Sequence, residues 1–168
     1  MLFRSRGIEA NPEKIRAVIN MQSPRTTKEV QSLAGRIAAL NRFISRVIDR
    51  CLPFFQIFRK AFEWSEECEK AFQELKGYLA SPPLLSTPVP KEKLLLYLAV
   101  SPLAVSSALV REEHGIQFPI YYTSRALQGA EGWYSRIEKL AFALITSARR
   151  LRQYFQAHTI VVLMVQPL

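Results

Sequence analysis

Residues 133–155, WYSRIEKLAFALITSARRLRQYF, form the stretch that most constrains how this chain can fold. Apolar side chains recur there at spacings of three, four and seven residues, which places them on one face of a helix. They are Ile137, Leu140, Ala141, Leu144, Ala148 and Leu151. The basic side chains fall largely on other faces, left for water or for a partner. The pattern predicts a helix of about 20 residues, about 30 Å long, which is enough to cross a small sheet.

Four strand-like runs surround this helix, three before it and one after it. They are Leu94 to Val100, Val105 to Arg111, Ile116 to Thr123 and Thr159 to Val165. His114-Gly115 lies between the second and third runs, as the turn of a hairpin does. The order β-β-β-α-β predicts an α+β fold in which a mixed sheet packs on the helix.

The first eighty residues have helical rather than strand-like patterns. Asn11-Pro12 is typical of a helix start, with a capping side chain followed by proline at the first helical position. Thr26 and Glu29 have the spacing of a capping box. Ser65 precedes two glutamates, and acids in a first turn complement the helix dipole. These signals predict a small helical unit.

A proline-rich stretch separates the two patterns. Residues 81–93 contain four prolines in the segment SPPLLSTPVP, which favours an extended, semi-rigid linker. We therefore expect three parts: the helical unit at 1–80, the linker at 81–93 and the sheet-forming part at 94–168.

The chain is basic, with a net charge of +9. Residues 1–50 contain ten Lys and Arg against four Asp and Glu, a net charge of +6. Such a balance favours acidic partners, nucleic acid in particular. The candidates for phosphate contacts are Lys28, Arg36, Arg42, Arg46 and Arg50. A solvated basic face without a partner is the open alternative.

The cysteines and the apolar runs indicate which classes of protein this chain does not resemble. Cys51 and Cys68 are seventeen residues apart without companions, so neither a disulfide framework nor a zinc site is indicated. We expect reduced thiols in an intracellular protein, with cytoplasm and nucleus both open. The apolar runs, such as Ile160 to Val165, have the length of a strand and are too short to span a membrane.

Several phrases along nearly the whole chain resemble one family. GIEANPEKIRAV resembles the exit from a polymerase palm into the thumb, and TTKEVQSLAGRIAALNRFI resembles thumb helices. FEWSEECEKAFQELKGYLASPPLL is similar to the segment that leads into an RNase H-like domain. LYLAVSPLAVSSALVRE, FPIYYTSRAL and YSRIEKLAFALITSARRLRQYFQAHTIVVL are similar to that domain strand by strand. The chain thus resembles the C-terminal half of the reverse transcriptase in Pol polyproteins of Gypsy-type LTR retrotransposons.

The resemblance implies a role for each part. Residues 1–80 would be the end of the palm with the helical thumb or connection. Residues 94–168 would be an RNase H-like domain truncated at its C-terminus, which makes the chain a fragment. The family's RNase H cleaves the RNA strand of a hybrid with two divalent metal ions, normally magnesium, held by carboxylates.

The residues at the family's acidic positions are uncharged here. They are Ala99 in the first strand, Leu140 in the long helix and Val165 at the end of the fourth strand. These side chains offer no oxygen ligand to a hard cation. Glu138 lies two residues from Leu140, about 200° around the helix, so it is expected to point away from the sheet. We therefore expect no bound metal, no cofactor and no nuclease activity.

Three functions remain open at this point. The leading one is a catalytically inactive scaffold that grips an RNA/DNA hybrid or duplex weakly and without sequence preference, beside the remainder of the Pol polyprotein. The second is an active hybrid ribonuclease with displaced metal ligands. The third is an inert remnant or a protein-interaction module. No membrane partner is expected.

Overall fold

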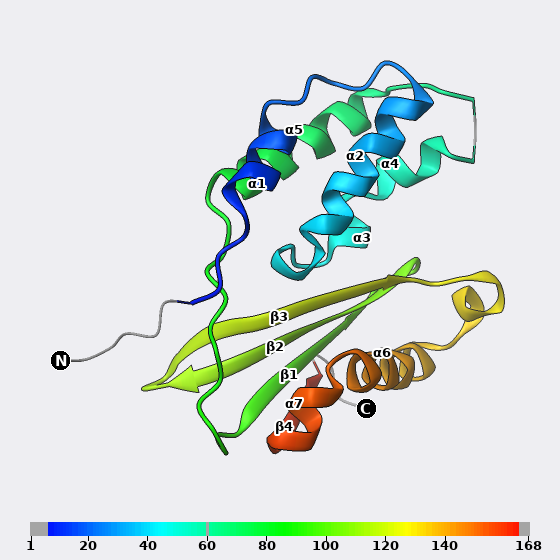
Figure 1. The fold of residues 1–168 in the computed structure, drawn as a ribbon. Helices are drawn as coiled ribbons and strands as arrows, with labels where there is room; N and C mark the ends of the chain where they lie inside the picture. Colours follow the sequence, from blue (N-terminus) through cyan, green and yellow to red (C-terminus); the bar gives the residue numbers. More distant parts are fainter. Residues whose placement is uncertain (1–6, 60, 165–168) are drawn as a thin grey trace.

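The structure is a computed structural model that describes residues 7–59 and 61–164. Figure 1 shows a helical unit (residues 7–80) lying next to a four-stranded sheet, and a sheet unit (residues 94–164) that contains the sheet and the helices on its other side. The predicted α+β class and the order β-β-β-α-β are confirmed.

The helical unit is built from short helices with well-defined starts. They are α1 (Pro12–Ile19), α2 (Thr27–Ala39), the 3-10 helix η1 (Asn41–Phe43), α3 (Val47–Arg50), α4 (Leu52–Ile57) and α5 (Glu66–Ala80). The predicted caps Asn11, Thr26 and Ser65 each accept a hydrogen bond from a backbone N–H in the first turn. The predicted capping box is only half right, because the Glu29 carboxylate accepts from the N–H of Arg25 instead of Thr26.

The helical unit has its own hydrophobic core. Phe54 stacks on Trp64 with ring centroids 5.5 Å apart, and Phe72 meets both rings edge-on. The stripe predicted for α2 is buried as well, with Val30 and Leu33 fully inside. Burial of these side chains stabilises the helical unit.

The sheet mixes antiparallel and parallel pairing, as predicted. Its strands are β1 (Leu94–Val100), β2 (Ala104–Glu113), β3 (Ile116–Ala126) and β4 (Ile160–Met164), in the spatial order β3-β2-β1-β4. β1 is antiparallel to β2 and parallel to β4, with Leu94 opposite Ile160. The predicted end of the fourth strand, Val165, lies outside the described residues.

The predicted hairpin between β2 and β3 is confirmed. Glu113 pairs with Ile116, so His114 and Gly115 form a two-residue loop. Their φ angles of 52° and 78° place both in the left-handed region, which is the geometry of a type I′ turn. This turn matches the right-handed twist of the two strands.

The long helix differs from its prediction in bounds, and its predicted buried face is only partly right. A 3-10 helix η2 (Gly129–Trp133) precedes α6 (Arg136–Arg150), and a break at Leu151 separates α6 from α7 (Arg152–Ala157). Ile137, predicted to be buried, is 60% exposed, and Ala141 is exposed too. Leu140, Leu144 and Leu151 of the predicted stripe pack against the sheet core. Two small residues outside the stripe face the sheet as well: Ala143 and Ser147, one turn apart, allow close packing against β1 and β2. Within the described ranges, no helix is long and apolar enough to cross a membrane.

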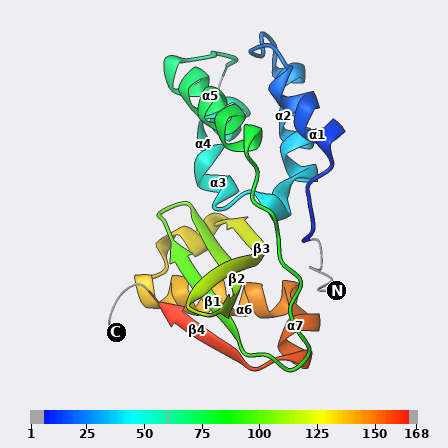
Figure 2. The ribbon, with the colours of Figure 1, turned by 90° about the vertical axis from the view of Figure 1, so that its left-hand side faces the viewer.

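The segment between the two units contacts both of them. Leu85 is fully buried and forms an antiparallel bridge with Ile8, and the N–H of Ser86 donates to the carbonyl oxygen of Pro119 in β3 at 2.7 Å. Figure 2 shows this segment running from α5 past the sheet to the start of β1. The division into parts at residues 81–93 stays a prediction.

Candidate nucleic-acid interface

Lys28 and Arg36 both lie on α2, and both are exposed. Lys28 makes no ion pair within residues 7–59 and 61–164. Arg36 differs, since its Nη1 donates to the carbonyl oxygen of Ala17 and thereby ties α2 to α1. Of these two cations, Lys28 is the one whose charge is available to a partner.

Arg42 joins the helical unit to the sheet unit. Its Nη2 donates to the carbonyl oxygen of Ile120 at 3.3 Å and to the hydroxyl of Tyr154 at 3.4 Å. Its guanidinium lies 4.5 Å from the ring centroid of Tyr121, a cation–π distance. Nε of Arg42 is buried and has no hydrogen-bond partner among the described residues. This side chain is therefore committed to the interior and not to solvent.

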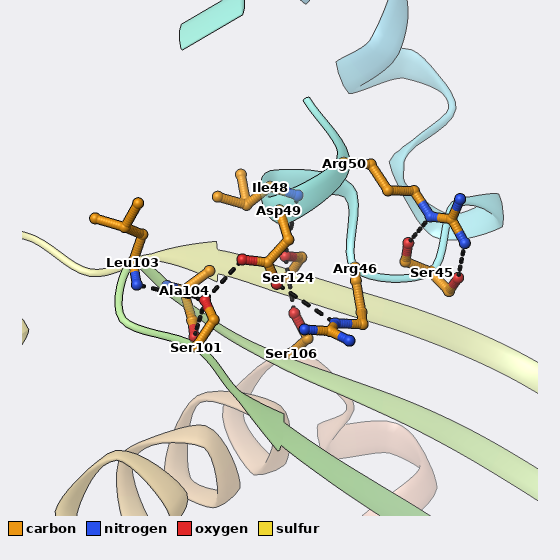
Figure 3. Close-up of polar contacts among 10 residues, drawn as sticks. All are labelled: Ser45, Arg46, Ile48, Asp49, Arg50, Ser101, Leu103, Ala104, Ser106 and Ser124. Carbon is orange, nitrogen blue, oxygen red and sulfur yellow. Dashed lines mark hydrogen bonds and ion pairs between the residues drawn. The ribbon is translucent and has the colours of Figure 1, made fainter. Parts of the chain in front are cut away.

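Arg46 is the N-cap residue of α3 and remains largely open to solvent. Its φ of 52° is left-handed, its side chain is 55% exposed, and its Nε lies 3.4 Å from Oδ2 of Asp49. Figure 3 shows that Asp49 also accepts a hydrogen bond from the hydroxyl of Ser101 at 2.7 Å. An exposed pair such as Arg46–Asp49 is weak and exchanges readily for other partners.

Arg50 is exposed but held by its neighbours. Its Nε donates to the carbonyl oxygen of Ser45 at 2.8 Å and its Nη2 to the Ser45 hydroxyl at 3.2 Å (Figure 3). Its guanidinium also lies 4.5 Å from the ring centroid of Tyr78. The hydroxyl of Tyr78 in turn donates to the carbonyl oxygen of Phe43 at 2.8 Å. Arg50 thus stabilises the turn before α3.

The five predicted cations therefore have different surroundings. Arg42, Arg36 and Arg50 contact backbone oxygens, whereas Lys28 and Arg46 extend toward solvent. The sequence did not reveal Asp49, Ser101 or Tyr154 as partners. Asp49 and Ser101 are separated by 52 positions, and Arg42 and Tyr154 by 112. Contacts over such distances leave no local pattern in a single sequence.

Two of the three family acidic positions fall within the described residues. Ala99 lies in β1 opposite Ser106 and is half-buried, and Leu140 lies in α6, where it packs against the sheet core. Val165 lies outside the described residues. Within residues 7–59 and 61–164, no three His, Cys, Asp or Glu side chains are grouped so that they could hold a metal ion. A methyl group and an isobutyl group do not fit the oxygen-ligand chemistry of magnesium.

Glu138 has a structural role at the start of α6. Its carboxylate accepts a hydrogen bond from the N–H of Ser135 at 2.6 Å, and the Ser135 hydroxyl accepts from the N–H of Glu138 at 3.3 Å. This reciprocal pair is a capping box. The carboxylate nearest to Leu140 in the sequence is thus engaged with the backbone.

Curated relatives include Pol polyproteins of retrotransposons. The retrovirus-related Pol polyprotein from transposon 297 of Drosophila melanogaster is 29% identical over 151 residues, covering 88% of this chain and 14% of that protein. The Pol polyprotein from transposon opus of the same species is 29% identical over 161 residues, covering 88% and 16%. The transposon Tf2-3 polyprotein of Schizosaccharomyces pombe is 26% identical and covers 90% and 12%. The chain spans about one seventh of the length of the first two relatives.

Solved structures with this fold include foamy viral protease-reverse transcriptases. One in complex with an RNA/DNA hybrid has a TM-score of 0.76 at 22% identity, covering 95% of this chain and 22% of that chain. One in complex with double-stranded DNA has a TM-score of 0.75 at 22% identity, covering 93% and 33%. Residues 64–162, more than half of the chain, match the family described as the RNase H-like domain found in reverse transcriptase. The resemblance to retrotransposon Pol polyproteins is thereby confirmed, and the chain belongs to the family of RNase H-like domains found in reverse transcriptases.

Proposed function

We propose that this chain is a catalytically inactive, duplex-gripping part of a retrotransposon reverse transcriptase. The observation that carries the proposal is the identity of the residues at the family's acidic positions, where Ala99 and Leu140 provide no metal ligand. A nuclease of this family needs clustered carboxylates to hold its metal ions. Without them, the property left to the unit is binding.

Two observations support the gripping role. Residues 1–50 carry a net charge of +6, and Lys28 and Arg46 extend from the helical unit into solvent. Foamy viral reverse transcriptases of the same fold are described in complex with double-stranded DNA and with RNA/DNA hybrid. Phosphate contacts from such cations are independent of base sequence. Two contacts would give a slope of about −2 for log affinity against log salt concentration.

A hybrid-binding titration tests the grip. Fluorescence anisotropy of a labelled RNA/DNA hybrid, measured with the full chain at several salt concentrations, gives the slope. We expect Lys28→Ala and Arg46→Ala each to reduce it by about one unit. Lys70→Ala is the matched control, because Lys70 is an exposed lysine on a different helix, α5. Equal effects of all three variants would mean that the basic surface is only solvated, as expected of an inert module.

A cleavage assay tests the lack of catalysis separately. The labelled hybrid is incubated with the chain and either magnesium or manganese, beside an active RNase H as positive control. We expect no cleavage above background. Cleavage that disappears with Glu138→Gln would favour the ribonuclease with displaced ligands and overturn the inactive assignment.

A further inference from the structure

A small pocket lies between α6 and the β2–β3 hairpin. Its walls include Thr123 and Arg125 from β3 and Thr146, Ser147 and Arg150 from α6. Its volume is about 90 Å³. That is about three times the volume that one molecule occupies in liquid water. It is well below the 300 Å³ or so at which sites for drug-sized ligands begin. The pocket therefore suits a small ion.

The chemistry of the walls favours an anion. Two of the side chains are guanidinium groups, and five carry hydroxyls: Ser106, Thr123, Ser124, Thr146 and Ser147. No carboxylate lines the pocket within the described residues. Arginine donors in a fixed fork and hydroxyl donors are the groups that bind tetrahedral oxyanions such as phosphate.

The two arginines differ in how they are held. Arg125 lies 4.6 Å from the ring centroid of Phe142, and its Nη2 is 3.1 Å from Oε1 of Glu131, so its position is fixed and its charge is partly balanced. Arg150 is exposed and makes no ion pair or side-chain hydrogen bond within the described residues. Arg125 provides a pre-positioned donor, and Arg150 provides the uncompensated charge.

Two of the pocket's hydroxyls, those of Thr123 and Ser147, belong to a buried hydrogen-bond network. Ser147 is 2% exposed; its hydroxyl donates to the carbonyl oxygen of Ala143 at 2.7 Å and shares a hydrogen bond of 2.8 Å with the hydroxyl of Ser107. Ser107 also shares a hydrogen bond with Thr123, which is 5% exposed. The Thr146 hydroxyl has no hydrogen-bond partner within residues 7–59 and 61–164, which leaves its proton available. A buried polar network next to free donors is a pre-organised site.

The geometry points to a binding site for one phosphate-type oxyanion in this pocket, with Arg150, Arg125 and Thr146 as its donors. The ion is either a free phosphate group or a phosphate of a nucleic-acid backbone, since both present the same tetrahedral oxygens. The site does not depend on the grip of the helical unit, because none of its residues lies there.

The test is a titration of the full chain with inorganic phosphate at constant ionic strength, followed by amide NMR shifts. We expect saturable shifts centred on Ser124, Thr146 and Ser147. Arg150→Ala should weaken binding about tenfold, the effect of losing one charge-assisted hydrogen bond. Thr146→Val should weaken it less and keep the fold. Arg149→Ala is the matched control, since Arg149 is an exposed neighbour of equal charge that does not line the pocket.

A second arm identifies the source of the phosphate. The same variants are titrated with the labelled hybrid, with and without inorganic phosphate as competitor. If Arg150→Ala weakens both ligands and phosphate competes, the pocket takes a backbone phosphate. If only phosphate binding is weakened, it takes a free phosphate group. Equal effects of Arg150→Ala and Arg149→Ala on phosphate, or no saturable shifts in the unaltered chain, would overturn the site whatever the helical unit does.

Discussion

The hydroxyl of Ser101 donates a 2.7 Å hydrogen bond to Oδ1 of Asp49, and this contact joins the end of β1 to α3. The hydroxyl oxygen of Ser101 also accepts a hydrogen bond from the N–H of Ala104 at 3.0 Å. This one hydroxyl therefore shapes the β1–β2 turn and contacts the helical unit. A backbone contact lies nearby, where the N–H of Ile48 donates to the hydroxyl of Ser124 at 3.3 Å (Figure 3). The two units therefore meet through directional polar contacts as well as through apolar surface.

Removing Asp49 and Ser101 together should reveal their coupling. In a double-mutant cycle with Asp49→Ala and Ser101→Ala, we expect the free energies of unfolding to couple by about 1 kcal/mol, the net contribution of one such hydrogen bond. Urea unfolding followed by circular dichroism measures this coupling. The control cycle pairs Ser101→Ala with Lys70→Ala, which share no contact and should be additive. Additivity in the first cycle would contradict the contact.

Arg42 should matter for stability more than for binding. Arg42→Met removes two hydrogen bonds and a cation–π contact, and we expect the free energy of unfolding to fall by about 1 to 3 kcal/mol. The control is Arg46→Met, whose side chain is 55% exposed; its effect should stay within about 0.5 kcal/mol. Thermal or urea unfolding compares the two. A larger loss for Arg46→Met would reverse the roles that we assign to these arginines.

Glu69 should make the helical unit sensitive to acid. Hydrogen bonds from Ser23, then from Trp64 and Gln73, lower the pKa of Glu69 below its ordinary range. A carboxylate with a lowered folded pKa stabilises the protein above its unfolded pKa, about 4.3, and that contribution disappears as the pH falls through the folded pKa. Glu69→Gln should therefore lower the urea midpoint at pH 7 and flatten its decline below about pH 4.

Trp64 fluorescence reports this unfolding directly, because the Trp64 indole N–H donates to Glu69 at 2.7 Å. Glu74→Gln is the matched control, an exposed glutamate on the same helix. Identical pH profiles for the two variants would show that the Glu69 hydrogen bonds contribute nothing to acid stability.

Cys51 should be inert while the protein is folded. Its side chain is fully buried, and burial raises the pKa of Cys51 to about 12. A thiol reagent attacks only the thiolate, so labelling at pH 8 should require opening of the helical unit. Both cysteines should react fully in urea. Thr87→Cys, at an exposed position in the segment before β1, provides the reactive control. Rapid labelling of Cys51 without denaturant would contradict its burial.

The local features of the fold could be predicted from the sequence. The caps at Asn11 and Ser65 and the turn at His114-Gly115 depend on residues within a few positions of each other, and such signals survive in one sequence. Only part of the buried face of α6 could be predicted. Leu140 and Leu144 pack on the core as expected, whereas Ala143 and Ser147 are buried because they are small and Ile137 is exposed despite its hydrophobicity. Periodicity identifies an amphipathic helix but does not show which residues the sheet can approach.

The candidate site was predictable in charge but not in geometry. The excess of cations in residues 1–50 is a property of composition, whereas the commitment of Arg42 to Ile120 and Tyr154 depends on how two units dock. The pocket around Arg150 has the same origin. Thr123, Arg125 and Arg150 are ordinary residues in sequence, and only the packing of α6 on β3 brings them together.

The parallel pairing of β1 with β4 has a consequence for folding during synthesis. Leu94 cannot pair with Ile160 until the 65 residues between them have left the ribosome. Until then, one edge of β1 remains unpaired. Loop closure over that distance is slow compared with formation of the β2–β3 hairpin, whose partners are nearly adjacent in the chain. The waiting strand reads LLLYLAV, an uncharged segment of the kind that associates with other chains when exposed. The protein is thus most prone to aggregation during synthesis, between the emergence of β1 from the ribosome and its pairing with β4.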